Sequence, residues 1–184
     1  MPRVVYNTAT TLNGFIATAD HSLDWLFAVP GAAEAESAFP AFLETIGAIV
    51  MGSSTYEWIL RHEEMLDHPE RWVYGSRAAW VFSSREQPLI PGAPIRIVSG
   101  PVAGAWAAIA ESAGEKDVWV VGGGDLAGQF ADAGHLDEVR LSLAPVALDG
   151  GMPVLPRTLL ADRLSLVSAE RQGQFAELRF AVRA

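Results

Sequence analysis

The stretch Val118-Trp119-Val120-Val121-Gly122-Gly123-Gly124-Asp125-Leu126-Ala127-Gly128-Gln129-Phe130 joins an apolar run to a glycine turn and a helix start. Its first four residues predict a buried strand, and a helix opens at Asp125 after three glycines. Glycine backbone allows a ligand to approach closely, and the first turn of a helix offers unpaired N–H groups. The stretch therefore predicts an anion-binding turn, although a simple tight turn also accounts for a run of glycines.

Strands and helices alternate along the rest of the chain. Apolar runs predict strands at residues 3–9, 48–51, 79–82, 95–98, 118–121 and 138–143. Helical spacing and capping residues predict helices at 32–46, 53–60, 101–113 and 125–133, with Pro40 as a kink or an early residue of the first. Residues 10–24 are predicted to be a loop with a short extended piece at 14–17, and 61–78 a surface connection.

The last part of the chain has a different pattern. Residues 163–171 and 174–182 predict two strands joined in a hairpin around Gln172-Gly173. Strands that alternate with helices favour a mostly parallel sheet with helices on both faces, and the hairpin adds an antiparallel edge. We therefore expect an α/β fold.

Three predicted strand ends carry residues that suit a phosphate group. They are Gly52-Ser53-Ser54-Thr55, Ser83-Ser84-Arg85 and Gly122-Gly123-Gly124. Ligands of parallel sheets bind outside the carboxyl ends of the strands. Three such ends at one edge of a sheet predict a long, multiply charged ligand such as a dinucleotide.

Composition narrows the class of protein. The chain has 184 residues, half of them hydrophobic and 19% charged, which predicts one folded domain over residues 1–184. No apolar run approaches the ~20 residues of a membrane helix, and the N-terminus does not resemble a signal peptide, so we expect a cytoplasmic protein. The net charge of −9 and the lack of a basic stripe argue against a nucleic-acid partner.

The same composition limits the chemistry. The chain has no cysteine, which excludes disulfides, thiolate catalysis and cysteine-based metal sites. The four histidines are scattered without zinc-ligand spacing and are interpreted as solvated loop residues, so no metal is expected.

Several motifs in order resemble one known family. They are Thr11-Leu12-Asn13-Gly14-Phe15-Ile16-Ala17, Val50-Met51-Gly52-Ser53-Ser54-Thr55-Tyr56-Glu57, Val81-Phe82-Ser83-Ser84-Arg85, Val120-Val121-Gly122-Gly123-Gly124, Leu136-Asp137-Glu138-Val139, Ala144-Pro145-Val146 and Gly150-Gly151. The chain resembles the dihydrofolate-reductase-like family. It is most similar to the reductase domain of the bifunctional deaminase–reductase of riboflavin biosynthesis. The deaminase signatures H-x-E and P-C-x-x-C are absent. The resemblance implies a three-layer fold and reductase activity.

The resemblance also implies NADPH as the cofactor, bound along the strand ends. Backbone groups of Ala9 and Ile16 would bracket the nicotinamide amide. The pyrophosphate would lie between two groups of residues, namely Gly52, Ser53, Ser54 and Thr55 on one side and Gly122, Gly123, Gly124, Asp125 and Leu126 on the other. Ser83, Ser84 and Arg85 would meet the adenosine 2′-phosphate, and a cis peptide would join Gly122 to Gly123.

The chain departs from the family pattern at three positions. Asn13 stands where the deaminase–reductase group usually has aspartate, and Ser53 stands where dihydrofolate reductases often have arginine. Recognition of the 2′-phosphate therefore rests more heavily on Arg85. Asp125 suits a helix N-cap, but its charge would compete with a phosphate there.

The substrate side is less defined by the resemblance. Glu36, with Glu34 as its neighbour in case of a register error, falls near the carboxylate with which dihydrofolate reductases grip the pterin. A surface glutamate near a helix start is the alternative interpretation. Asn13 would hydrogen-bond a polar substrate, and Trp25 either walls the pocket or belongs to the core.

Three functions stay open at this point. The first is an NADPH-dependent reductase of a small heterocycle, with a 5-amino-6-(5-phosphoribosylamino)uracil-type pyrimidine as the favoured substrate. The second is dihydrofolate reduction, and the third is a nucleotide-binding module without catalysis. A homodimer is expected because relatives associate through this domain and because apolar segments occur near the C-terminal strands, at Val146-Ala147-Leu148 and Leu164-Ser165-Leu166-Val167.

Overall fold

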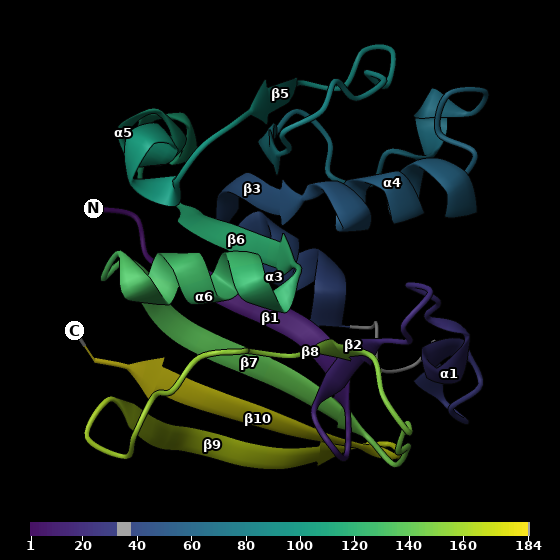
Figure 1. Cartoon of the computed structure of the whole chain (residues 1–184), viewed down its shortest axis with the longest axis vertical. Helices are drawn as coiled ribbons and strands as arrows, with labels where there is room; N and C mark the ends of the chain where they lie inside the picture. Colours follow the sequence, from purple (N-terminus) through teal and green to yellow (C-terminus); the bar gives the residue numbers. More distant parts are fainter. Residues whose placement is uncertain (33–37, 184) are drawn as a thin grey trace.

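A computed structural model describes residues 1–32 and 38–183 of the chain. Its main sheet has eight strands in the order β5-β4-β3-β6-β1-β7-β10-β9 (Figure 1). The bounds in chain order are β1 Val4–Thr11, β3 Ile46–Gly52, β4 Ala78–Phe82, β5 Ile95–Val98, β6 Asp117–Gly122, β7 Leu136–Ala144, β9 Leu164–Gln172 and β10 Phe175–Val182. Neighbours are parallel from β5 to β7, and β10 and β9 are antiparallel. The predicted mostly parallel sheet with a C-terminal hairpin is confirmed.

Helices cover both faces of this sheet. They are α3 Phe39–Glu44, α4 Ser53–His62, α5 Val102–Ala113 and α6 Gly124–Asp132, together with the short α1 Asp24–Phe27 and a 3-10 helix at Pro69–Arg71. In Figure 1, α5 and α6 lie in front of the sheet and α3 lies behind it. None of the helices in the described ranges is long and apolar enough to cross a membrane.

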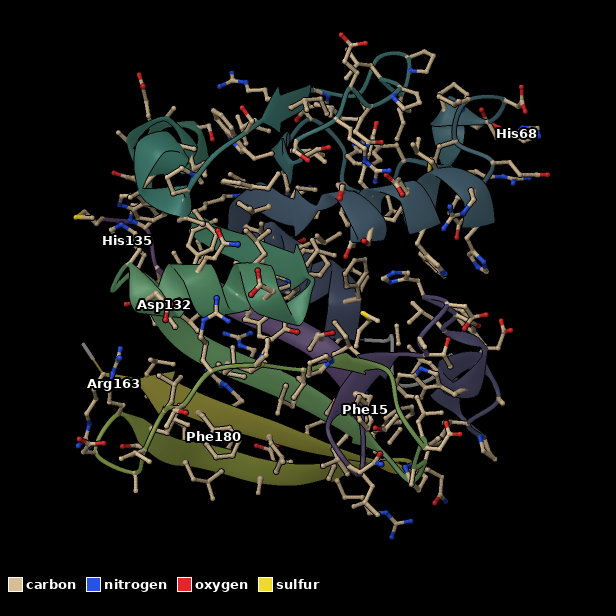
Figure 2. The ribbon with its side chains drawn as sticks, viewed as in Figure 1. Phe15, His68, Asp132, His135, Arg163 and Phe180 are labelled. Atoms are coloured by element: carbon tan, nitrogen blue, oxygen red, sulfur yellow. The ribbon has the colours of Figure 1, made fainter. Side chains whose placement is uncertain are left out.

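Alternation along the strands divides the core into two apolar clusters. In β3, Ala48 and Val50 pack with α5 and α6, whereas Ile49 and Met51 pack with α3 and α4. Phe180 extends the first cluster along β10 (Figure 2). These two layers of helices around one sheet confirm the three-layer fold.

A second, two-stranded antiparallel sheet lies beside the main one. It pairs β2, Phe15–Ala17, with β8, Met152–Pro153, and Figure 1 shows them side by side. The backbone N–H of Val154 also donates to the carbonyl oxygen of Gly14 at 2.9 Å. The sequence predicts β2 as the extended piece at 14–17. It does not predict β8, because two residues are too few to show an alternating pattern. This pairing draws the segment after β7 against the first loop.

The helix predicted over residues 32–46 ends earlier than predicted, and its residues 33–37 lie outside the described part of the chain. Its described part, α3, begins at Phe39 with Pro40 in its first turn, where proline is tolerated. Ile46 already belongs to β3 and pairs with Asp117 of β6. The predicted loop at 10–24 is also partly wrong, because β1 continues to Thr11 and α1 begins at Asp24.

One buried carboxylate links β7 and β10 to Arg3, the residue just before β1. The side chain of Glu138 in β7 is 4% exposed and pairs with Arg3, Arg140 and Arg179, the last from β10 at 2.9 Å. Burial alone would raise the pKa of Glu138, but the hydrogen bonds from Arg140, Arg179 and Arg3 outweigh it and hold this pKa at about 2. This charge cluster is a feature of the sheet that the sequence motifs did not reveal.

Candidate functional site

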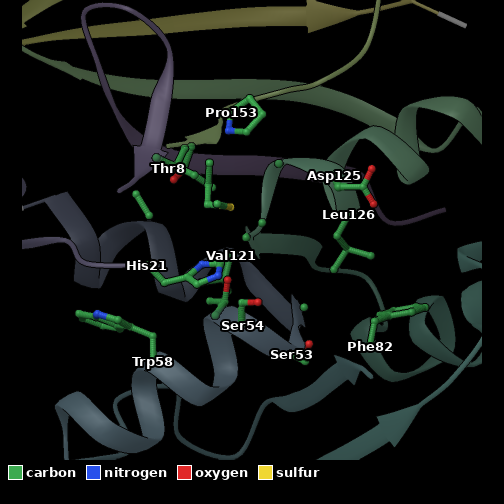
Figure 3. Close-up of a pocket in the computed structure, with 18 of the residues that line it drawn as sticks. Thr8, His21, Ser53, Ser54, Trp58, Phe82, Val121, Asp125, Leu126 and Pro153 are labelled. Carbon is green, nitrogen blue, oxygen red and sulfur yellow. The ribbon is translucent and has the colours of Figure 1, made fainter. Parts of the chain in front are cut away.

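A cavity of about 550 Å³ opens at the carboxyl ends of the parallel strands (Figure 3). The strand residues that line it are Thr8 of β1, Gly52 of β3, Phe82 of β4, and Val121 and Gly122 of β6. The small sheet closes one side, with Ile16 and Ala17 from β2 and Met152 and Pro153 from β8. The sequence predicts that the three strand ends with residues suited to a phosphate, at Gly52, Ser83 and Gly122, meet at this edge of the sheet.

Two helices begin at this cavity. Helix α4 starts at Ser53 after the N-cap Gly52, and α6 starts at Gly124 after the N-cap Gly123. Because both N-caps are glycines, no side chain caps either helix. The N–H groups of both first turns and the positive ends of both helix dipoles therefore favour an anion in the cavity.

The glycines between β6 and α6 have different surroundings. The Gly122–Gly123 peptide is cis, as predicted. A Cβ at Gly123 would have Ile16 Cδ1 as its nearest neighbour at 3.9 Å, so the space beside this residue belongs to the cavity. A Cβ at Gly124 would lie 2.2 Å from the carbonyl oxygen of Pro153, so α6 can pack against β8 only without a side chain here. Gly123 thus leaves room for a ligand, and Gly124 allows the packing that shapes the cavity.

Comparison with known proteins gives the family. The family model described as the RibD C-terminal domain matches residues 2–175. The chain belongs to this family. It is 28% identical over 178 residues to YwjB of Bacillus subtilis (strain 168), with 97% of each chain covered.

Solved structures agree on the fold of this RibD C-terminal domain chain. A protein of Shewanella sp. PV-4 named for riboflavin biosynthesis superposes with a TM-score of 0.79 at 23% identity, over the whole of both chains. A diaminohydroxyphosphoribosylaminopyrimidine deaminase/5-amino-6-(5-phosphoribosylamino)uracil reductase of Thermotoga maritima gives 0.70 at 16% identity, covering 98% of this chain and 56% of that one. Dihydrofolate reductase of Enterococcus faecalis, complexed with NADP(H), gives 0.62 at 14% identity, with 98% and 96% covered. The dihydrofolate-reductase-like fold is therefore established.

Ten of the predicted cofactor residues line the cavity of this family member. They are Ile16, Gly52, Ser53, Ser54, Thr55, Gly122, Gly123, Gly124, Asp125 and Leu126. Asp125 was expected to compete with a phosphate. Its carboxylate is 67% exposed, accepts a hydrogen bond from Gln129 and pairs with Arg157 at 3.0 Å. The Gln129 hydrogen bond and then Arg157 lower the pKa of Asp125, and the Arg157 charge offsets part of its repulsion toward an anion.

The predicted 2′-phosphate residues lie just beyond the cavity. Phe82 lines it, whereas Ser83, Ser84 and Arg85 are not among its lining residues. The Ser83 hydroxyl accepts from the backbone N–H of Arg85 and donates to its carbonyl oxygen, which holds the loop in a tight turn. Arg85 faces a second cavity of about 340 Å³, where its Nη2 donates to Glu57 Oε1 at 2.7 Å.

The predicted substrate residues are placed apart from the cavity lining. The Asn13 amide donates to the carbonyl oxygen of Leu148 at 2.6 Å and accepts from its N–H at 3.2 Å, which ties two loops together. Trp25 packs in a third apolar cluster with Ala144 and Phe175, and Ala9 packs against that cluster. Glu36 and Glu34 lie outside the described residues.

Other cavity residues were missed in the sequence. His21, Trp58 and Gln129 all line the cavity. His21 has a φ of +65°, and in Figure 3 it lies with Trp58 toward the end opposite Phe82 and Leu126. The position of Trp58, one turn after Ser54 and Thr55 on the same helix, could have indicated its role. No local pattern marks His21, because only the path of the first loop brings it to the cavity.

Proposed function

We propose that this protein is an NADPH-dependent reductase of a small heterocycle, with a 5-amino-6-(5-phosphoribosylamino)uracil-type pyrimidine as its substrate. One observation carries the proposal, namely that two uncapped helix N-termini, at Ser53 and Gly124, open onto one cavity with glycine backbone. The family supports it, because a relative of the same fold is named as a reductase of that pyrimidine.

The residues of the chain fit an extended dinucleotide. The first turns of α4 and α6 would bind the pyrophosphate through backbone N–H groups, with glycine backbone allowing close approach. Ile16, at the rim of the small sheet, would cover the nicotinamide, and Trp58 and Met152 would form apolar walls that exclude water. When bound, a nicotinamide cofactor supplies hydride, so the protein has to orient the two reactants and deliver at most one proton.

The decisive experiment follows NADPH oxidation with a panel of substrates. We expect turnover with the deaminated riboflavin precursor and little with dihydrofolate. Efficient turnover of dihydrofolate alone would make the protein a dihydrofolate reductase instead. NADPH binding without turnover of any substrate would favour a non-catalytic nucleotide-binding module.

The proposal includes a preference for NADPH over NADH. Arginine makes charge-assisted hydrogen bonds to a phosphate that it cannot make to a ribose hydroxyl. Arg85→Ala should therefore weaken NADPH binding by ~1.5–3 kcal/mol and leave NADH binding nearly unchanged. Calorimetric titration of both nucleotides measures this, and an equal loss for both would contradict the role of Arg85.

A further inference from the structure

Glu57 forms an ion pair with Arg85, the arginine proposed to bind the 2′-phosphate of the cofactor. Its Oε1 accepts from Arg85 Nη2 at 2.7 Å and from Gln87 Nε2 at 2.8 Å. Gln87 Nε2 also lies 3.3 Å from the Ser83 hydroxyl, so the carboxylate belongs to a network anchored to the loop after β4. The Glu57 side chain is 28% exposed and that of Arg85 is 68% exposed. The Glu57 carboxylate is thus fixed by two hydrogen bonds, whereas the Arg85 guanidinium is accessible to a ligand.

Helix α4 places this pair beside the main cavity. Ser54, Thr55 and Trp58 line the main cavity, whereas Glu57 and Leu60, from the same helix, line the second one. The second cavity also contains Arg61 and the loop residues Arg85, Glu86, Gln87 and Pro88. A dinucleotide that leaves the main cavity at Phe82 would therefore meet Arg85 three residues farther along the chain, with Glu57 already in contact with it.

The two members of the pair favour different nucleotides. In dinucleotide sites a carboxylate accepts from a ribose 2′-hydroxyl, whereas an arginine accommodates a 2′-phosphate. A 2′-phosphate that approaches Arg85 meets the negative charge of Glu57, but a neutral ribose hydroxyl does not. We propose that Glu57 is a specificity-determining residue that competes with the 2′-phosphate for Arg85 and so narrows the preference for NADPH over NADH.

Glu57 could instead help by holding Arg85 in position, and magnitudes decide between the two effects. An ion pair to a largely exposed arginine restrains it only weakly. A phosphate monoester carries close to two negative charges at neutral pH, so its repulsion by a nearby carboxylate is the larger effect. The inference rests on the proposed function, because it requires that the cofactor reaches Arg85.

The test is titration of NADPH and NADH into the full chain and its Glu57→Gln variant at an ionic strength of about 0.15 M, where charges that do not contact the phosphate are screened. The variant should bind NADPH about tenfold more tightly, equivalent to about 1.4 kcal/mol. NADH affinity should change less than about twofold, because its ribose carries no charge at this position. Circular dichroism checks that the variant is folded.

Glu86→Gln is the matched control. Glu86 lines the same second cavity, and the variant removes the same charge without touching the Arg85 pair. It should change the affinity for NADPH less than about twofold.

Each outcome separates the inference from the proposed function. Tighter NADPH binding in Glu57→Gln alone supports the competition. Weaker NADPH binding in Glu57→Gln would show that Glu57 positions Arg85 and would overturn the inference. An unchanged ratio of NADPH to NADH affinity, or an equal effect of Glu86→Gln, would overturn it too. All three results leave the proposed function intact. If the unmodified protein binds neither nucleotide, the proposed function is wrong and the inference falls with it.

Discussion

Gly123 and Gly124 are adjacent, but a side chain would have opposite consequences at the two positions. At Gly123 a Cβ enters the cavity with Ile16 Cδ1 at 3.9 Å as its nearest neighbour, and at Gly124 it would lie 2.2 Å from the Pro153 carbonyl oxygen. Gly123→Val should therefore fold normally and lose NADPH binding, because the side chain fills the space proposed for the pyrophosphate. Thermal unfolding and nucleotide titration measure the two properties.

Gly124→Ala provides the complementary variant. It should lower the free energy of unfolding by about 1–3 kcal/mol, because α6 has to move away from β8. Normal NADPH binding by Gly123→Val would remove this turn from the proposed site.

Glu36 is the second residue whose role can be tested directly, even though it lies outside the described residues. If its carboxylate grips the substrate or relays a proton, Glu36→Gln should cut kcat about 10²-fold while the affinity for NADPH stays the same. Steady-state kinetics over a range of pH measure this. Glu34→Gln is the control, and a loss of turnover in that variant instead would move the role to Glu34.

At the residue scale, the backbone part of the site could be predicted and the side-chain part could not. Gly52, Gly123 and Gly124 line the cavity, and the sequence points to them because a strand that ends in glycine before a helix favours a ligand at that strand end. His21 lies in a turn directly after β2, in which its backbone N–H donates to the carbonyl oxygen of Thr18, and this turn lies beside the cavity. The turn can be read from local residues, but its place beside the cavity depends on the fold and leaves no pattern in the sequence.

At the scale of elements, the same reasoning explains which strands and helices were predictable. The strands of the parallel sheet are buried on both faces, so their apolar runs are distinctive, as in Ala48 to Met51. The short α1 has four residues, too few for helical periodicity, and its Trp25 is buried by neighbours from β7 and β10. Such elements are stabilised by tertiary packing rather than by their own sequence.

The Glu138 cluster joins elements that are far apart in the chain, and its effect on stability depends on pH. Because the folded pKa of Glu138 is about 2, below the usual 4.5, its contribution is present above pH 4.5 and is lost as the pH falls toward 2. Glu138→Gln should lower the free energy of unfolding by about 2–4 kcal/mol at pH 7, because three arginines lose a buried acceptor. Urea unfolding at pH 7, 5 and 3 should show this difference shrinking with acid.

Glu177 is the matched control on β10. It accepts from the Ser142 hydroxyl of β7 at 2.8 Å, and burial raises its pKa. The pKa shift of Glu177 is opposite in direction to that of Glu138. Glu177→Gln should therefore lower the free energy of unfolding less than Glu138→Gln at pH 7, and the contribution of Glu177 to stability should not decrease as the pH falls. Equal losses in the two variants at every pH would show that the arginines contribute nothing specific.

At the scale of the whole molecule, the feature to explain is the exposed edge of the main sheet at β9. Strand β9 ends the order of the main sheet, and its partner among the described strands is β10 alone. Leu166 and Val167 on this strand are 61% and 57% exposed. An open edge strand with exposed apolar side chains is a surface that proteins usually cover. We therefore expect β9 to form the contact between two copies of the chain.

Leu166→Lys tests this assembly, because a charge at the centre of the contact should convert a dimer into a monomer while the sheet remains folded. Light scattering coupled to size exclusion, over a range of protein concentrations, measures the mass of each form. Leu160→Lys is the control, since Leu160 is 66% exposed but lies in the connection before β9, and it should leave the dimer intact. A monomer mass for the unmodified protein at every concentration would end the proposal, and dissociation by both variants would place the contact outside β9.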